Sequence, residues 1–463
     1  MTEEQTRKKV IAAFKGFIKT YRLEPLSVRR DSLEPKYFHS WRVFSDDKDR
    51  KFELYYRVKS HNEVLKMIER LFPEQTDRKL VNSILLDAIN SWITEGKDAN
   101  DQEQLEQAGS QFISEIEKQI MPRKLFVPID GLEITSLKSL KVANCEIFNN
   151  HERSEWRQLV EQHRKRFSEE VSQPTKWYEE VKVYFTVDIS AHPGRAVERA
   201  IEETNLALSI LRLFVSSYYF HEHEQSMVRR LGLFGSLNTL ERRYVWYTNP
   251  DLPIEEQYPG GSESSKILSN IEIDTEFFEY MKRFGLERIN DLIQSIGQSR
   301  NNDIARRILR AISWYSKATS ARSITDSYLM YAIAIEALLS EDRTPQETYS
   351  TQMAALVTCE NDDCLIYPVG GYISSSFSKQ LKKASSINDR FNLIYQRALD
   401  LFTYRNRIAH GAVLDAEIDP GNLLDFETIV KNSIMAFVIK NCETFGIFKN
   451  WVRNSVRYDY KPS

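Results

Sequence analysis

The feature that most constrains the fold is a long amphipathic segment near the C-terminus, residues 386–410. Its apolar residues recur every three or four positions, which predicts one helix with a buried stripe. The stripe consists of Phe391, Ile394, Tyr395, Ala398, Leu401, Phe402, Ile408 and Ala409. Arg405 falls on the same stripe. A guanidinium there needs a carboxylate, a partner subunit or an anionic ligand, because an unpaired buried charge is strongly unfavourable.

A second segment, residues 328–339, is apolar on nearly every side and has Glu336 as its only charge. We therefore predict a buried helix with a buried carboxylate, for which Arg405 is the complementary cation. One interpretation is a structural ion pair that fastens a helical bundle, since buried pairs are often retained for specificity. The other interpretation is that Glu336 holds Arg405 in a catalytic rotamer.

The end of the first segment carries residue types that suit RNA cleavage without a metal. His410 could exchange a proton near neutral pH, and Arg405 could stabilise the charge that builds on phosphorus. On an ideal helix these two side chains point about 140° apart, whereas Asn406 and His410 share a face. Gly411 is a natural helix C-cap, so the chain can unwind beside His410. Asn406 would orient His410 or a phosphate, with a plain helix hydrogen bond as the alternative, and core packing is the alternative for His410.

This pattern, Arg-Asn-x-x-x-His-Gly behind a helix of the Ile-Glu-Ala-Leu-Leu type, resembles the HEPN superfamily of small helical-bundle ribonucleases. Within it, the chain looks most like the ApeA-like group of bacterial defence proteins, where a HEPN domain follows a divergent N-terminal region. The resemblance covers residues 301–450. It implies a metal-independent endoribonuclease in anti-phage defence or toxin-like growth arrest, with Arg405, Asn406 and His410 catalytic and Glu336 supporting. It also implies a homodimer formed through the C-terminal bundle, with the two motifs sharing one cleft.

Two other functions compete with this interpretation. The first is a non-catalytic HEPN module that dimerises and binds a partner protein or nucleic acid. The second is a metal-dependent hydrolase around His221 and His223, although on a helix these side chains would point about 200° apart. Cys359 and Cys364 have no second pair that would complete a zinc site. We expect neither a metal nor a cofactor, because Walker, Rossmann and common hydrolase motifs are missing.

The formal net charge of −3 argues against a chain that coats nucleic acid indiscriminately, so an RNA site must be a local patch. Four cations around the motif segment are the candidates, with simple solvation as the alternative: Lys382, Lys383, Arg390 and Arg407. Four cysteines are too few for a disulfide scaffold, and no signal segment opens the chain. No apolar run reaches the roughly 18 residues that cross a bilayer, so we expect a cytoplasmic protein without membrane contact.

A chain of 463 residues predicts about three domains. We expect a mostly α protein in which a divergent α+β N-terminal region precedes a HEPN-type helical bundle. Residues 1–100 should be helical with a strand at 52–58, and residues 101–265 should be α+β with strands at 124–134, 139–148 and 180–189 and a helix at 195–219. Residues 274–463 should form the bundle, with helices at 303–320, 325–340, 344–359, 386–410 and 423–444 and a loop at 370–378. The N-terminal region would sense or restrain, with a phage or host trigger as its partner.

Overall fold

The computed structural model describes residues 2–25, 37–45, 51–149, 182–218, 231–233, 240–247, 260–267, 271–298, 303–321, 323–341, 344–358, 373–413 and 417–455. The chain is mostly α-helical with small β-sheets, as predicted. It divides into two compact units: Met1–Leu125 with Asp188–Ile201, and Phe126–Val187 with Glu202–Ser463. In the described part of the chain, no helix is long and apolar enough to span a membrane.

The first unit combines four helices with a three-stranded antiparallel sheet of order β1-β3-β2. Its elements are α1 (Glu3–Ile18), β1 (Arg22–Pro25), β2 (Tyr37–Ser45), β3 (Lys51–Arg57), α2 (Val58–Leu71), α3 (Arg78–Thr94) and α4 (Gln102–Gln119). Phe14 of α1 and Phe112 of α4 stack in the core, with ring centroids 5.2 Å apart. Because α4 buries its apolar face in this core, the unit extends past the boundary predicted at residue 100.

The predicted strands of the middle region are present in a five-stranded sheet of order β6-β7-β8-β4-β9. The strands are β4 (Met121–Asp130), β6 (Ser139–Val142), β7 (Cys145–Asn149), β8 (Val183–Ala191) and β9 (Gly232–Leu233). Smaller pairs are β5 (Leu132–Ile134) with β12 (Ile271–Ile273), and β10 (Leu240–Tyr247) with β11 (Gly260–Ile267). Helix α7 (Pro193–Tyr218) follows β8, as predicted. Residues Phe126–Val187 belong to the same compact unit as the C-terminal helices, so residues 101–265 do not form a region of their own.

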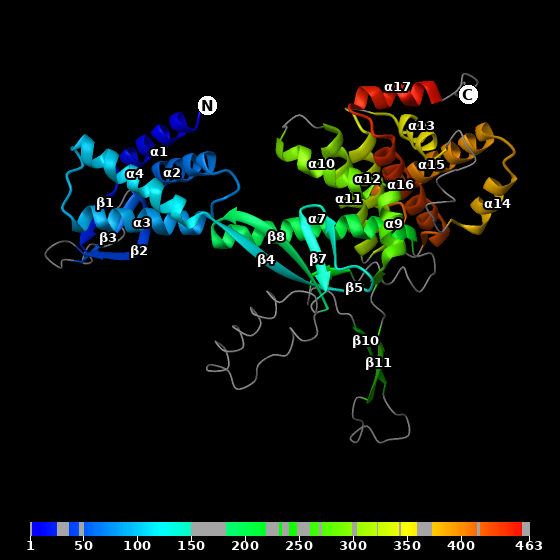
Figure 1. The fold of residues 1–463 in the computed structure, drawn as a ribbon, viewed down its shortest axis with the longest axis horizontal. Helices are drawn as coiled ribbons and strands as arrows, with labels where there is room; N and C mark the ends of the chain where they lie inside the picture. The colour runs from blue at the N-terminus through cyan, green and yellow to red at the C-terminus, as the bar shows by residue number, and fades with distance from the viewer. Residues whose placement is uncertain are drawn as a thin grey trace. The chain divides into compact units, whose positions relative to one another are not determined.

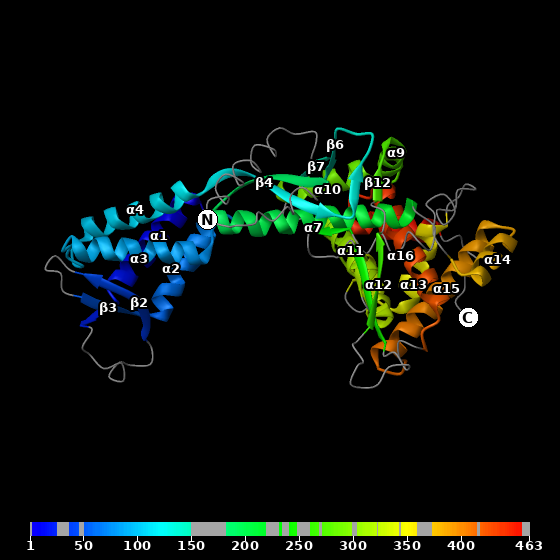
Figure 2. The ribbon, with the colours of Figure 1, turned by 90° about the horizontal axis from the view of Figure 1, so that it is seen from below.

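The C-terminal helices form a bundle around α16, which is buried along most of its length (Figure 1). The helices are α9 (Thr275–Arg283), α10 (Leu286–Gln298), α11 (Asp303–Ser320), α12 (Ile324–Leu339), α13 (Gln346–Val357), α14 (Ser375–Lys383), α15 (Ile387–Ala409), α16 (Pro420–Lys440) and α17 (Phe445–Ser455). The five predicted bundle helices are confirmed. The predicted loop at 370–378 is wrong from Ser375 onward, because Ser374 caps a helix there. In Figures 1 and 2, α14 and α15 lie on the far side of α12 and α16 from α10.

Aromatic packing sets the position of α15 in the bundle. The ring of Phe402 lies 5.5 Å from that of Tyr349 on α13 and 5.6 Å from that of Phe426 on α16. Tyr328 of α12 lies 4.8 Å from the same Phe426 ring. Offset and edge contacts of this kind add to the free energy of burial. Three neighbouring helices therefore hold the middle of α15.

Candidate functional site

Helix α15 begins and ends at the predicted residues. Ser386 caps its N-terminus in a capping box with Asp389, in which each side chain accepts a hydrogen bond from the other residue's backbone N–H. Six residues of the predicted stripe are buried: Ile394, Tyr395, Ala398, Leu401, Phe402 and Ile408. Phe391 is half-buried and Ala409 is exposed. Ala409 was wrongly predicted as buried, because the helix ends at this residue and the chain turns outward.

The C-terminus of α15 is a Schellman turn. Gly411 has φ +69°, a left-handed conformation that glycine adopts without strain. Its N–H donates to the carbonyl of Ile408 at 2.9 Å, and the N–H of Ala412 donates to the carbonyl of Arg407 at 2.8 Å. His410 is the C-cap residue and its side chain is exposed. The predicted cap is thus confirmed, and it presents an imidazole to solvent at the helix end.

Arg405 forms the predicted ion pair with Glu336. Nη2 of Arg405 lies 2.8 Å from Oε1 of Glu336, and the two side chains are 26% and 31% exposed. The predicted burial of Glu336 is therefore wrong. Glu336 lies in the last turn of α12, where its carboxylate reaches the edge of the bundle. Burial nevertheless raises the pKa of Glu336 above its ordinary value, and the opposing effect of Arg405 is smaller.

The third member of this group is Asn406, and it contacts Arg405 instead of His410. Nη1 of Arg405 donates to Oδ1 of Asn406 at 3.0 Å. The Nε of Arg405 is buried and has no hydrogen-bond partner. Within the described residues, no hydrogen bond or ion pair joins the imidazole of His410 to another side chain. The structure thus brings Glu336, Arg405 and Asn406 together and leaves His410 free at the end of the same helix.

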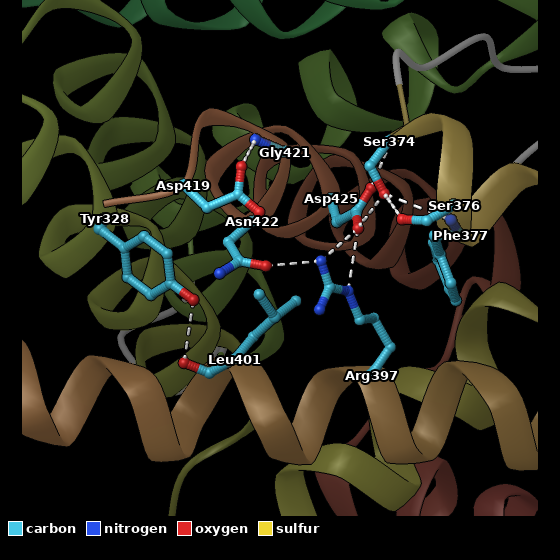
Figure 3. A network of polar contacts seen from close by, with 10 residues as sticks. All are labelled: Tyr328, Ser374, Ser376, Phe377, Arg397, Leu401, Asp419, Gly421, Asn422 and Asp425. Atoms are coloured by element: carbon cyan, nitrogen blue, oxygen red, sulfur yellow. Dashed lines mark hydrogen bonds and ion pairs between the residues drawn. The ribbon is translucent and has the colours of Figure 1, made fainter. Parts of the chain in front are cut away.

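A second polar network, which the sequence did not reveal, holds the middle of α15 (Figure 3). Asp425 of α16 is fully buried and accepts hydrogen bonds from the backbone N–H of Ser374 at 2.6 Å, from its hydroxyl at 2.8 Å and from Nε of Arg397 at 2.9 Å. Nη2 of Arg397 also donates to Oδ1 of Asn422 at 2.8 Å. These contacts join the N-terminus of α14 to α15 and α16. The signal in the sequence was Asp425, one of two acids in the largely apolar segment of α16.

No family model matches the chain, and no curated protein or solved structure matches it significantly. We therefore infer the function from the resemblance of the motif and from the geometry of the site.

The cations predicted to bind RNA do not form one patch. Lys382 and Lys383 end α14, and Arg390 lies in the first turn of α15, whereas Arg407 lies in its last turn. A helix of 23 residues is about 34 Å long, so the first three lie at the opposite end of α15 from His410. Arg407 alone lies beside the motif, with its guanidinium 5.7 Å from the ring centroid of Tyr404.

Two cations in the bundle were not predicted from the sequence, the buried Lys431 and the half-buried Arg212. Lys431 of α16 is 2% exposed, and its Nζ donates to the carbonyl of Ser216 at 2.8 Å. Arg212 donates through Nη1 to the hydroxyl of Ser316 at 2.8 Å. Burial lowers the pKa of Lys431 to about 8 and that of Arg212 to about 10. These contacts join the C-terminal half of α7 to α11 and α16, so this half of α7 belongs to the bundle core.

The metal hypotheses find no support in the described residues. His221 and His223 lie outside them, as do Cys359 and Cys364. No group of three or more potential metal ligands occurs in the part of the chain that the structure describes. Its two cysteines are buried and unpaired: Cys145 and Cys442. Burial also raises the pKa of the Cys145 thiol to about 12, which makes it unreactive at neutral pH.

Proposed function

We propose that the C-terminal bundle is a metal-independent endoribonuclease of the HEPN type. The observation that carries the proposal is the state of Arg405. Its guanidinium is held by Glu336 at 2.8 Å and by Asn406 at 3.0 Å, on the helix that ends in the exposed imidazole of His410. RNA transesterification requires a fixed cation for the charge that builds on the phosphoryl group and a side chain that transfers protons, and this helix carries one candidate for each role.

In this reaction the 2′-oxygen of a ribose attacks the adjacent phosphorus, and the bond from phosphorus to the 5′-oxygen breaks. His410 would accept the 2′-hydroxyl proton as the new bond to phosphorus forms, and would then donate a proton to the leaving 5′-oxygen. Arg405 would stabilise the negative charge on the phosphoryl oxygens, and Glu336 would keep its guanidinium in place. Asn406 would support Arg405 through its side-chain oxygen. The products would be a 2′,3′-cyclic phosphate and a free 5′-hydroxyl.

The setting follows from the resemblance. We place the activity in bacterial anti-phage defence or toxin-like growth arrest in the cytoplasm, with RNA as the substrate. The first unit would sense a phage or host trigger, or restrain the nuclease until the trigger arrives. This role is what the resemblance implies, because in the ApeA-like group a HEPN domain follows a larger N-terminal region.

The decisive experiment incubates the purified protein with total RNA in EDTA and compares wild type with His410→Ala and Arg405→Ala. Each variant should cleave at least about a hundredfold more slowly, as expected when a proton-transfer or charge-stabilising group is removed. Arg453→Ala, which truncates an exposed arginine on α17, is the matched control and should cleave like wild type. Thermal unfolding of each variant checks that the fold is intact.

A requirement for Mg²⁺ or Mn²⁺, or full activity in either motif variant, would contradict this mechanism. The fragment ends should carry cyclic or 3′-phosphates, which distinguishes attack by the 2′-hydroxyl from metal-dependent hydrolysis that leaves 5′-phosphates.

One observation favours the non-catalytic alternative. The Glu336–Arg405 pair is complete in itself, and no described residue orients His410. In a binding module the pair would only stabilise the bundle. His410→Ala would then leave every measurable property unchanged, and no preparation would cleave RNA.

A further inference from the structure

A basic stripe follows the outer face of α11. Arg306, Arg310 and Lys317 are exposed and lie four and seven residues apart, which places them within about 40° of one another around the helix. The residues that face the bundle lie on the opposite side: Ile304, Ala305, Ile308, Ala311, Ile312 and Tyr315. Core packing therefore leaves the cations on one outward face, in a chain whose net charge is −3.

The charges of this stripe are not balanced within α11. The single acid of the helix, Asp303, pairs with Arg307, whose Nε lies 2.7 Å from its carboxylate. Arg307 also turns inward, where Nη1 donates to the carbonyl of Ser340 at 2.6 Å. Arg310 and Lys317 have no ion pair with any described residue. Arg310 and Lys317 thus keep the capacity to bind phosphates, whereas Arg307 serves the structure.

An aromatic ring lies at the edge of the same stripe. Trp314 is half-buried, and the Nζ of Lys317 lies 4.3 Å from its ring centroid. Proteins that bind single-stranded nucleic acid combine a row of cations along the backbone with aromatic rings on which bases stack. At about 1.5 Å of rise per residue, Arg306 and Lys317 lie about 16 Å apart along the helix axis, a length that several phosphates of one strand can follow.

The stripe begins at the end of the bundle that holds Arg405. Arg307 bonds to the carbonyl of Ser340, and Glu336 lies one turn earlier on the same helix, where it pairs with Arg405. In Figures 1 and 2, α11 lies on the opposite side of α12 from α14, which carries Lys382 and Lys383. The stripe is thus a different surface from the patch predicted from the sequence.

We infer that the outer face of α11 binds a single RNA strand, with Arg310 and Lys317 on its phosphates and Trp314 stacked on a base. The inference rests on the proposed function only in calling this strand the substrate. Bound along the stripe, the strand would run toward the ion pair that fixes Arg405.

The test measures binding of a fluorescent single-stranded RNA of about 20 nucleotides to the full chain in EDTA at several salt concentrations, in the His410→Ala background. Adding Arg310→Glu and Lys317→Glu should weaken binding at least about tenfold and reduce the slope of log Kd against log salt by about 1.4, or about 0.7 for each lost phosphate contact. Lys66→Glu with Arg70→Glu, on the exposed face of α2, makes the same change in charge and should bind like the parent.

A second pair of variants tests the ring. Trp314→Ala should weaken binding about tenfold because base stacking is lost, and Trp314→Phe should restore most of the affinity. Equal affinity and equal salt slope for the α11 and α2 double variants would overturn the inference, and would assign the stripe to an acidic protein surface or to solvent.

The two proposals fail separately. Binding that depends on the stripe without any cleavage by the wild-type protein would refute the nuclease and keep the RNA surface. Cleavage by the wild-type protein together with RNA binding that the α11 substitutions do not weaken would refute the RNA surface and keep the nuclease.

Discussion

Arg405 forms an ion pair with Glu336, donates a hydrogen bond to Asn406, and has 26% of its side-chain surface in solvent. This exposure decides how the pair can act. A fully buried arginine could not reach a phosphate, whereas a fully exposed one would not be held in a single rotamer. Partial burial is the state in which a guanidinium is both positioned and accessible. The pair therefore suits a positioning role for Glu336 better than a purely structural one.

Changing Glu336 tests this role. With full burial, Glu336→Ala would strand Arg405 at a cost of roughly 3 kcal/mol, but solvent at both side chains reduces our expectation to about 1 kcal/mol. Glu336→Gln keeps an acceptor for Arg405 and should cost less. For both variants, the increase in activation free energy calculated from the cleavage rates should exceed the decrease in the free energy of unfolding. Urea unfolding and initial rates on the same preparations give the two numbers.

The pH dependence gives a second readout of the same prediction. Because burial raises the pKa of Glu336, the folded state favours the protonated carboxyl. Its contribution to stability is complete below the ordinary pKa near 4.5 and is lost as pH rises through the raised value. Wild type should thus gain stability relative to Glu336→Gln as pH falls from 7 toward 4.5. A constant difference would show that the fold does not shift this pKa.

At the scale of elements, α15 is held at three levels along its length. The capping box fixes its first turn, the network of Arg397 and Asp425 fixes its middle, and the Schellman turn ends it at His410. Tyr328 adds a hydrogen bond to the carbonyl of Leu401 at 3.1 Å, which is one turn before Arg405. The helix is therefore rigid where it presents the motif, and only the exposed side chain of His410 is left to adapt.

Asp425→Asn tests how much of this rigidity comes from the buried network. The amide would place a donor among the four donor groups, two on Ser374 and two on Arg397, from which Asp425 now accepts hydrogen bonds, and would leave Arg397 without its counter-charge. We expect a loss of roughly 3 kcal/mol in the free energy of unfolding. A double-mutant cycle with Arg397→Ala should recover part of the loss as coupling energy. Stability within error of wild type would mean that the network is replaced by water.

At the scale of the whole molecule, the bundle does not begin at residue 274 as predicted. The C-terminal half of α7 lies inside the second unit. Its Ser216 carbonyl accepts a hydrogen bond from Lys431, and its Arg212 donates one to the hydroxyl of Ser316. A fragment from residue 274 would leave the Lys431 ammonium buried without its acceptor. Assembly is therefore a question for the full chain.

The homodimer remains a prediction, but the structure does not support the contact surface that we expected for it. We expected leftover apolar side chains on α11 and α15 to supply the contact. However, α11 has no exposed large apolar residue, and α15 has only Ile387, which is 42% exposed. Light scattering on the full chain should still show a dimer, because Arg405 and His410 diverge on one helix and two motifs complete a cleft more easily. A monomer that cleaves RNA would exclude a shared site.

The sequence by itself determined the features that depend on neighbours along the chain. Helix ends followed from caps such as Ser386 and Gly411, whose hydrogen bonds reach only three to five residues, and the strands followed from short-range alternation. The pairing of Glu336 with Arg405 could also be predicted, because Glu336 is the one charge of residues 328–339 and Arg405 falls on the apolar stripe of residues 386–410. The catalytic roles remain predictions.

Only the tertiary structure decided which surfaces stay open and which elements share a core. Residues distant in the sequence decided how deeply Glu336 is buried and whether Asn406 turns toward Arg405 or His410. They also decided whether the outward face of α11 carries cations or apolar residues. The same holds for the contact of Lys431 with Ser216. Periodicity shows that a helix has a buried face, but the neighbours that cover the face, and the depth of burial, are set by packing between segments far apart in the chain.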